Sequence, residues 1–450
     1  MRTAAPARCD ASVNRQEGYP AVRIICIAVP FVAFNYTMNT IRIVIVGAGF
    51  GGIYALKRFH QLFHGNARIQ ITLVSEKNYF LFIPLLHEVA TGSINQSNII
   101  EPIRKFLGCY INTLHIARAT QVNLAQRTLD TTDGILSYDY LVLAPGSETN
   151  FYGTPGAQEH SFILKSLDGA LKLKNHCIAM IEQGSHIGDR DKRKNALRFV
   201  IVCGGPTGVE LAAELEEFMK HTFARYYSKE VMDDVSIMVL QKGSEVLPQF
   251  AKPLRAKSLE VLTKKGIDVR LQTSVTRVTG DVIELSDGST LGTRTVVWTA
   301  GVKPVRIPFA EDVREGNGGK IAVNRYLHLE AYPEVYAIGD VAEVKTADGA
   351  ALPALAQVAV QEAQIAADNI RRHIDGQALE PFSYKSAGSL VSLGQWMAVG
   401  EISRVVLWGH FTWWLWRANY LYHLISWRKK LQVMLDWTLN SFSPRDISQV

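Results

Sequence analysis

Two glycine-rich turns in this chain are of the type that binds the pyrophosphate of a dinucleotide. The first, Gly47–Gly52, follows the apolar run Ile41–Val46, and the second, Cys203–Gly208, follows Phe199–Val202. A turn between a buried strand and a helix presents backbone N–H groups, and the positive end of the helix dipole adds to their attraction for phosphate. Two such turns predict that two dinucleotides bind together, as a flavoprotein reduced by a nicotinamide nucleotide requires.

The strand that follows each turn ends differently. In the first unit Ile69–Val74 reads as a strand, and Glu76 follows it near the spacing at which a carboxylate binds the ribose of adenosine. In the second unit the strand is Val235–Leu240, and we match Gln241 to Glu76, with Lys242 after it. A carboxylate repels a 2′-phosphate, whereas an amide beside a lysine repels it much less. We therefore expect NADH to bind and leave NADPH use open.

Further apolar runs indicate that one nucleotide unit interrupts the other. Tyr138–Pro145, Thr295–Trp298 and Val335–Ile338 read as buried strands of parallel sheets. We predict an α/β fold with two Rossmann-like dinucleotide-binding domains, the first discontinuous and the second inserted into it. The expected segments are a poorly ordered extension at 1–37, the first domain at 38–154 and 303–385, the inserted domain at 155–302, and a C-terminal region at 386–450.

The composition excludes several kinds of site. The 450 residues are 47% hydrophobic and 20% charged, as in a folded protein of two to three domains. The net charge of +6 includes no basic run that resembles a nucleic-acid-binding tail, so we expect no nucleic acid partner. The five cysteines include no Cys-x-x-Cys pair, which removes the redox dithiol of disulfide reductases and predicts no metal site.

As an ordered set, the motifs of this chain resemble those of the type II NADH:quinone oxidoreductases, single-subunit enzymes that do not pump protons. The resemblance covers roughly residues 38–440 and rests on Gly47–Gly52, Tyr79–Gly92, Ala144–Phe151, Gly204–Glu210, Val297–Val302, Tyr336–Asp340 and Ala356–Gln361. The last of these, Ala-Gln-x-Ala-x-Gln, discriminates best. The resemblance implies that tightly bound FAD takes a hydride from NADH and passes two electrons to a membrane quinone of a respiratory chain.

The resemblance also assigns cofactor-binding residues. The FAD site would include Gly47, Gly49, Gly52 and Glu76 at the ADP half, Gly339 and Asp340 at the ribityl or pyrophosphate region, and Gly146 and Ala356. The NADH site would include Gly205, Gly208, Gln241 and Gly301. These assignments place FAD in the first domain and NADH in the inserted domain.

Four further residues take catalytic roles by the same resemblance. Glu210 would be the acid near nicotinamide and flavin and a donor of protons, on a helix that also carries Glu214 and Glu217. Gln357 and Gln361 stand four residues apart, hence on one helix face, and would help form the quinone pocket, with Lys385 nearby. Each has a plainer alternative. Glu210 could be a charge in the first turn of its helix, the two glutamines could lie on a solvated helix face, and Lys385 could be a surface lysine.

The C-terminal region has the composition of helices that lie in a membrane interface. Seven of the eight tryptophans fall between Trp396 and Trp437, interrupted by arginines and lysines, and the longest charge-free run, Val405–Trp416, is too short to span a bilayer. We expect a peripheral membrane protein, on the cytoplasmic face of the inner membrane if bacterial, and a homodimer. Deleting residues 404–450 should release it from membranes and leave NADH reduction of FAD. An aromatic core or a dimer interface is the alternative.

Two other functions remain open from the residues alone. A sulfide:quinone oxidoreductase needs a cysteine relay at the flavin, and this sequence has no cysteine beyond Cys203. A redox-responsive protein that binds FAD and NADH, and turns over slowly, would need the same two glycine turns. Turnover of NADH with a soluble quinone separates the enzyme from the sensor.

Overall fold

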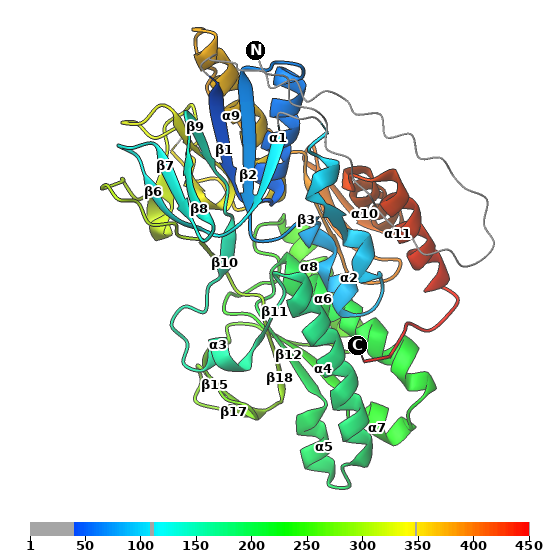
Figure 1. The fold of residues 1–450 in the computed structure, drawn as a ribbon. Coiled ribbons are helices and arrows are strands. Elements are labelled where there is room, and N and C mark those ends of the chain that lie inside the picture. Colours follow the sequence, from blue (N-terminus) through cyan, green and yellow to red (C-terminus); the bar gives the residue numbers. More distant parts are fainter. Residues whose placement is uncertain (1–39, 109–111, 347–348, 450) are drawn as a thin grey trace, which may run out of the picture. The chain divides into compact units, whose positions relative to one another are not determined.

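The first of two parallel sheets contains strands from distant parts of the chain. The computed structural model describes residues 40–108, 112–346 and 349–449, so the extension predicted at 1–37 lies outside the described residues. The strands run in the order β21 (Val335–Ala337), β9 (Tyr140–Leu143), β1 (Ile41–Val46), β2 (Ile69–Ser75) and β5 (Asn112–Ile116), each parallel to its neighbours (Figure 1). The β-branched run of β1 is buried at the centre of this sheet.

The second parallel sheet repeats this plan. Its order is β11 (Phe162–Ile163), β18 (Thr295–Trp298), β12 (Arg198–Val202), β13 (Ser236–Leu240) and β14 (Asp268–Arg270). All five strands lie between β9 and β21 in the sequence, so the second unit is inserted into the first. The predicted α/β fold class is confirmed, while the exact segment boundaries stay predictions.

The chain passes between the two sheets along a pair of short strands. β10 (Ser147–Thr149) and β19 (Val302–Pro304) pair antiparallel, one on the way into the second unit and the other on the way back. Each unit also carries a small antiparallel sheet. These are β6 (Ala119–Asn123), β7 (Thr128–Thr131) and β8 (Gly134–Ser137) in the first unit, and β15 (Val275–Val278), β16 (Val282–Leu285) and β17 (Thr290–Gly292) in the second.

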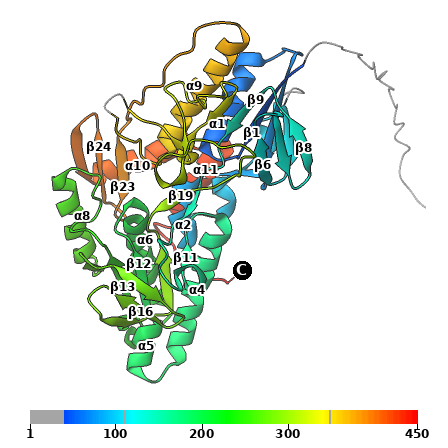
Figure 2. The same ribbon diagram turned by 90° about the vertical axis from the view of Figure 1, so that its left-hand side faces the viewer.

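The helices that start at the glycine turns pack between the sheets and other helices. α1 (Phe50–Phe63) begins at the first turn and lies along α9 (Ala356–Ile374) (Figure 2). It buries one face, which includes Phe59. α6 (Pro206–Glu217) begins at the second turn and packs on β13 and α2 (Leu86–Ala90). The other named elements are β3 (Tyr79–Leu81), β4 (Ile100–Pro102), α3 (Ala157–His160), α4 (Leu167–His186), α5 (Arg190–Ala196), α7 (Lys229–Asp233), α8 (Lys252–Lys264), β20 (Ile321–Ala322) and β22 (Ala342–Glu343).

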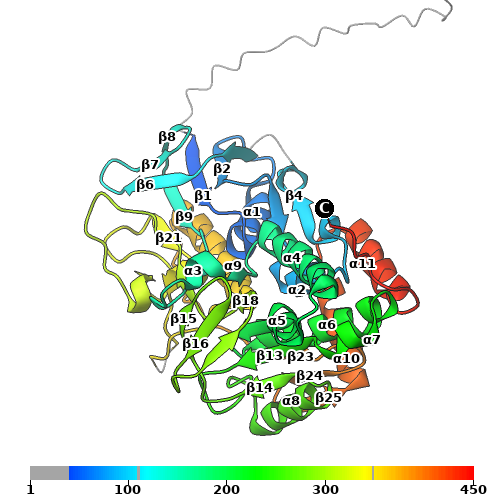
Figure 3. The ribbon, with the colours of Figure 1, turned by 90° about the horizontal axis from the view of Figure 1, so that it is seen from below.

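The predicted C-terminal helices are confirmed, and the structure adds a small sheet before them that was not predicted. The C-terminal region starts with an antiparallel sheet of β23 (Ser389–Ser392), β24 (Ala398–Ile402) and β25 (Val405–Gly409), and continues as α10 (His410–His423) and α11 (Trp427–Leu439) (Figure 3). The tryptophan pattern masked the strands because aromatic residues favour both interfaces and sheets. Within the described part of the chain, no helix combines the length and apolar character needed to cross a bilayer.

The tryptophans of this region divide between core and surface. Trp413, Trp416 and Trp437 are buried, so the aromatic-core alternative holds for these three. Trp396, Trp408, Trp414 and Trp427 are exposed. The C-terminal region therefore completes the protein core with one side and presents aromatic surface with the other.

The second glycine turn contains a strained residue. Cys203 has φ +95°, close to the φ of +98° at Gly47, its counterpart in the first turn. Both N–H groups donate 2.8 Å hydrogen bonds to the carbonyl of the neighbouring strand, Cys203 to Leu240 and Gly47 to Val74. A residue with a Cβ in this conformation is strained by about 1–3 kcal/mol, so the fold imposes a backbone conformation that the side chain opposes.

Replacing Cys203 by glycine should stabilise the protein. Relief of the positive φ outweighs the entropy that glycine adds to the unfolded chain, and we expect the free energy of unfolding to rise by about 1 kcal/mol. Urea denaturation measures it, with Cys203→Ala as the control because it removes Sγ and keeps the strain. Equal unfolding free energies for the two variants would contradict this explanation.

Candidate functional site

The glycines of the first turn have two different roles, close packing against the backbone and an open space for a bound group. A Cβ at Gly47 would overlap the carbonyl of Ala144, and a Cβ at Gly52 would overlap the carbonyl of Gly47. At Gly49, by contrast, a Cβ would meet nothing within 4 Å. Gly49 is also the N-cap of α1, where no side chain caps the helix and no acid stands in the first turn. An uncapped helix N-terminus of this kind suits the pyrophosphate of a dinucleotide.

The second turn has the same geometry around α6. Gly205 is the N-cap, again without a side-chain cap, and a Cβ at Gly208 would overlap the carbonyl of Cys203. Gly301 has φ +67° beyond β18, and a Cβ there would overlap the hydroxyl of Tyr152. The second unit therefore offers an N-terminal helix site of the same kind, in which close backbone contacts again require glycine.

The pairing of strands corrects one match made from the sequence. The corresponding neighbours of the two turns are Val46 with Val74 in the first sheet and Val202 with Leu240 in the second. Glu76 stands two residues beyond the strand pair, and in the second sheet Lys242 stands there, not Gln241. Gln241 is buried, and its Oε1 accepts a 2.9 Å hydrogen bond from the N–H of Gly204. Its amide therefore supports the glycine turn.

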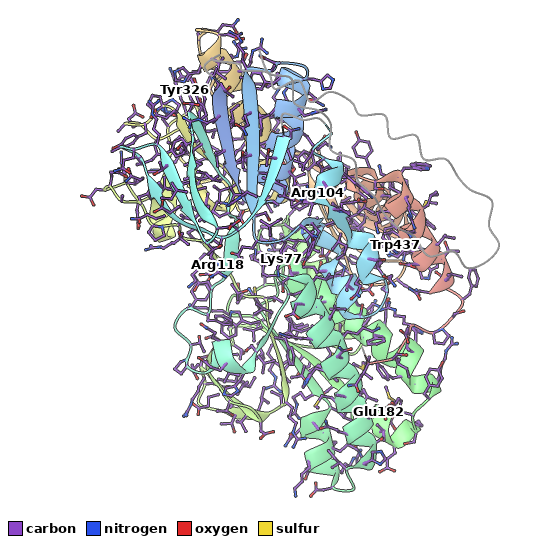
Figure 4. The ribbon with its side chains drawn as sticks, viewed as in Figure 1. Lys77, Arg104, Arg118, Glu182, Tyr326 and Trp437 are labelled. Atoms are coloured by element: carbon purple, nitrogen blue, oxygen red, sulfur yellow. The ribbon has the colours of Figure 1, made fainter. Side chains whose placement is uncertain are left out.

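Glu76 lies at the end of β2 beside a cation. Arg118 donates two hydrogen bonds to its carboxylate, of 3.0 and 3.2 Å, and both side chains are more than half exposed. Figure 4 labels Arg118 at this edge of the first sheet. The carboxylate is thus held at the strand end where the ADP half of a dinucleotide would lie.

A polar chain joins both units at the Gly339–Asp340 turn. Ser147 Oγ donates to Asp340 Oδ2, and Lys165 Nζ, from the loop between β11 and α4, donates to Ser147 Oγ at 2.9 Å. Burial lowers the pKa of Lys165, and Asp340 opposes this shift. Gly339 has φ +72°, and its N–H donates to Glu362 of α9. Neither Ser147 nor Lys165 was predicted as a site residue: Ser147 lies in the motif Ala144–Phe151 without an assigned role, and Lys165 lies outside the motifs.

A small pocket opens beside this turn. Its lining includes Gly339, Asp340, Leu355, Val358 and Glu362. Burial raises the pKa of Glu362 to about 8. Two other predicted residues stand at the ends of nearby elements: Gly146, with φ +79°, precedes β10, and Ala356 begins α9.

The two predicted glutamines lie together with Lys385. Gln361 accepts a 3.0 Å hydrogen bond from the N–H of Lys385 and donates at 2.8 Å to its carbonyl. Gln357 accepts from the N–H of Ala387 at 3.2 Å and donates to the carbonyl of Gly388 at 3.3 Å. Both amides therefore bind the extended segment 385–388 as a neighbouring strand would, while the Lys385 side chain is exposed.

Glu210 lies in a different, buried cluster. Its Oε1 accepts hydrogen bonds from the N–H of Ser392 and from Trp416 Nε1, both at 3.2 Å. Its Oε2 lies 3.9 Å from His87 Nδ1. Burial raises the pKa of Glu210 to about 8 and lowers that of His87 to about 4. Glu210 is therefore a neutral acid at pH 7 next to a neutral imidazole, which the simple helix-charge interpretation does not explain.

The same cluster holds three more acids and their cations. Glu88 accepts from Trp437 Nε1 at 2.5 Å, and burial together with Glu214 raises its pKa to about 8. Burial would raise the pKa of Glu214, but Arg445, which donates at 2.8 Å, and other neighbours hold it below its ordinary value. Lys265 donates to Glu217 at 2.7 Å. The spacing of Glu210, Glu214 and Glu217 on one helix face was the available sequence signal.

Comparison with known proteins identifies the family. Residues 41–363 match the family model described as pyridine nucleotide-disulphide oxidoreductase, and residues 386–446 match that of the NDH2 C-terminal domain. Type II NADH:quinone oxidoreductase Ndh of Mycobacterium tuberculosis is 30% identical over 422 residues, which cover 90% of this chain and 89% of that protein. A probable NADH dehydrogenase of Dictyostelium discoideum is 30% identical over 418 residues, 90% of this chain and 91% of that protein.

Solved structures confirm the fold. NDH2 from Plasmodium falciparum in complex with NADH has a TM-score of 0.84 at 21% identity, covering 91% of this chain and 100% of that one. The sulfide:quinone oxidoreductase from Aquifex aeolicus has a TM-score of 0.70 at 19% identity, covering 87% and 92%. The fold alone does not separate these two activities, but the C-terminal family match and the relatives do. The chain belongs to the type II NADH:quinone oxidoreductases, within the pyridine nucleotide-disulphide oxidoreductases, and transfers electrons from NADH to quinone.

Proposed function

We propose that FAD is bound at the first glycine turn and NADH at the second. The observation that carries this assignment is the matching geometry of the two turns, with φ of +98° at Gly47 and +95° at Cys203 before uncapped helices. FAD, when bound, supplies the redox chemistry by accepting a hydride from NADH and passing two electrons to quinone. The residues of the chain bind and orient the two cofactors and control the transfer of protons.

The polar chain at Gly339–Asp340 orients the flavin end of the cofactor in this proposal. Ser147 and Lys165 hold the carboxylate of Asp340, which would accept a hydrogen bond from a cofactor hydroxyl. Gly146 and Ala356 stand beside this region at the starts of β10 and α9. Because Lys165 comes from the inserted unit, its contact also fixes that unit against the FAD site.

Glu210 supplies a proton for quinone reduction in this proposal. The overall reaction converts NADH, one proton and quinone into NAD⁺ and quinol, so each turnover takes up one proton from water. With its pKa raised to about 8, Glu210 carries a proton at pH 7. It loses the proton as the pH rises through that value, and its ability to donate is lost with it.

We propose that the nucleotide site tolerates NADPH. Lys242 is exposed at the position where the first unit has Glu76, and a lysine attracts the 2′-phosphate that a carboxylate would repel. Gln241 contributes indirectly, because its side chain accepts a hydrogen bond from the N–H of Gly204 and so holds the glycine turn in place.

The quinone pocket of this proposal lies where α9 meets segment 385–388. Gln357 and Gln361 hold this segment through four hydrogen bonds, so they shape the wall of the pocket. The exposed ammonium of Lys385 is then free to face the site.

We propose that the exposed aromatic side of the C-terminal helices binds the membrane. α11 carries a stripe at helical spacing, and α10 adds exposed aromatic side chains. The exposed apolar residues are Phe411, Trp414, Tyr422, Trp427, Leu431, Met434, Leu435, Leu439 and Phe442, with Arg428 beside them. Tryptophan and arginine are the residues that favour a phospholipid headgroup region, and a quinone must be collected from the bilayer.

The same helices are part of the core, which changes how membrane attachment must be tested. Deleting residues 404–450 would remove Trp413, Trp416 and Trp437 from the core and Arg445 from Glu214. The predicted retention of NADH reduction after this deletion therefore does not follow, and point substitutions on the exposed face replace it. A peripheral position on the inner membrane, on its cytoplasmic face in a bacterium, and a homodimer stay predictions.

Substituting Glu210 by glutamine should separate the two half-reactions. NADH should still bleach the flavin of the FAD-loaded protein, while quinone should reoxidise it at least tenfold more slowly, since glutamine cannot donate a proton. Stopped-flow absorbance measures both steps. In the wild type the quinone step should fall as the pH rises through about 8.

Two results would count against this proposal. A colourless protein that cannot be loaded with FAD would refute the first cofactor site. Unchanged quinone reoxidation in Glu210→Gln would refute the role of Glu210. Glu216→Gln, a change at another acid of α6 whose carboxylate pairs with Lys220, serves as the matched control.

Reversing the charge of Lys242 should lower NADPH use. For Lys242→Glu we expect kcat/KM with NADPH to fall about tenfold, because an exposed attraction becomes a repulsion, and kcat/KM with NADH to change little. Steady-state rates with both nucleotides measure it. Strong exclusion of NADPH by the wild-type protein would refute the proposed tolerance.

Substitution of exposed apolar residues should release the protein from lipid. The double variant Trp427→Ser/Leu435→Ser should bind vesicles of anionic phospholipid at least tenfold more weakly, because it removes apolar area worth about 25 cal/mol per Å² of buried surface. Vesicle sedimentation measures binding. Ile135→Ser on β8, also an exposed apolar position, is the control. Equal binding by all three proteins, or loss of a dimer instead, would exclude membrane docking by this face.

A further inference from the structure

Helix α10 has two faces with different environments. Thr412, Trp413 and Trp416 are buried, whereas Phe411 and Trp414 are 68% and 56% exposed. The helix therefore reaches from the exposed aromatic surface into the cluster around Glu210.

Trp416 makes the connection to that cluster through its indole N–H. Nε1 donates to Glu210 Oε1 at 3.2 Å, although 206 residues separate the two in the sequence. The ring is 1% exposed and is fixed by its neighbours His87, Tyr420 and Trp437, with ring centroids 6.1, 4.7 and 6.2 Å away. A buried indole N–H needs an acceptor, and here the carboxyl group of Glu210 is that acceptor.

The two donors to Glu210 select one of its oxygens. Ser392 N–H and Trp416 Nε1 both donate to Oε1, and in a neutral carboxylic acid the carbonyl oxygen is a stronger acceptor than the hydroxyl oxygen. In the neutral acid the proton therefore resides on Oε2. That oxygen lies 3.9 Å from His87 Nδ1, which is too far for a hydrogen bond, so the O–H is free to donate elsewhere.

The charged and titratable neighbours of Glu210 come from every element packed around it. They are His87 and Glu88 of α2, Glu214 and Glu217 of α6, Arg417 and Tyr420 of α10, and Arg445 of the C-terminal tail. Arg417 is stacked on Trp413 and Trp437, 3.7 and 4.5 Å from the ring centroids. Trp416 bonds directly to Glu210 through its side chain, and Ser392, also in the C-terminal region, does so through its backbone N–H.

We infer that Trp416 is a positioning residue for Glu210: its N–H holds Oε1 as an acceptor, directs the transferable proton to Oε2, and ties this geometry to the seating of α10. The inference rests on the proposed role of Glu210 as the proton-holding residue. It extends that role by linking the helix that carries the exposed aromatic face to the acid that serves the quinone.

Trp416→Phe tests the inference because phenylalanine keeps an aromatic ring and lacks the N–H. We expect quinone reoxidation of the flavin to be about tenfold slower at pH 7, and flavin bleaching by NADH to be unchanged. The N–H favours the ionised carboxylate, so its loss raises the pKa of Glu210. The alkaline midpoint of the quinone step should move up by about one pH unit, the effect of one hydrogen bond to a carboxylate.

Two controls separate positioning from a general loss of packing. Trp408→Phe changes an exposed tryptophan of β25, outside the proposed membrane-binding face, and should leave the pH profile unchanged. β-(3-Benzothienyl)alanine at position 416 keeps the shape of tryptophan without an N–H, so it gives the result even if Trp416→Phe fails to fold. It should reproduce the pH shift.

The outcomes distinguish this inference from the proposal on which it rests. If Glu210→Gln slows the quinone step and the benzothienyl variant has the wild-type profile, Trp416 does not position Glu210. If Glu210→Gln has no effect, the proposed role of Glu210 fails instead. A shifted midpoint with intact flavin bleaching supports Trp416 as the positioning residue.

Discussion

The buried acids where α2 packs against α6 depend on hydrogen-bond partners from the C-terminal region of the chain. Glu88, Glu210 and Glu214 receive hydrogen bonds from Trp437, Trp416 and Arg445. An unpartnered buried charge costs several kcal/mol, so a cluster of this kind is stable only if each member is neutral or paired. Here Glu210 and Glu88 are neutral because burial raises their pKa, and Glu214 is ionised because Arg445 lies against it. The C-terminal region thus belongs to the electrostatic core of the protein.

This arrangement gives one segment two tasks. The inner side of α10 and α11 supplies indole N–H groups to Glu210 and Glu88, and the tail after α11 supplies the guanidinium of Arg445 to Glu214. The outer side of the two helices carries exposed aromatic and aliphatic residues. The two helices cannot be removed without loss of the core, because the buried and the exposed side chains are only a few residues apart on the same helix. The exposed aromatic surface and the environment of Glu210 are therefore physically coupled through the same helices.

The two nucleotide units show how a repeated backbone tolerates different chemistry. Four strands follow the same order in the two sheets, β9-β1-β2-β5 and β18-β12-β13-β14, and the glycine turns share hydrogen bonding and φ. At two corresponding positions the residues differ: the second unit has Cys203 where the first has Gly47, and Lys242 where the first has Glu76. The first change costs conformational strain, and the second changes the charge presented to a nucleotide. The backbone requirements come from close contacts, whereas the charge at the strand ends comes from side chains.

The sequence by itself determined the parts that depend on local pattern. β-Branched runs followed by glycine turns predicted both parallel sheets and their helices, since a strand buried on two faces and a turn with close backbone contacts each demand particular residue types. Tertiary structure decided the rest. The match of Glu76 to Lys242 required the strand register, and the strands at 389–409 were hidden by aromatic composition. The partners of Glu210 come from residues 87, 392 and 416, and no local pattern records a contact between side chains that distant in the chain, because only folding brings them together.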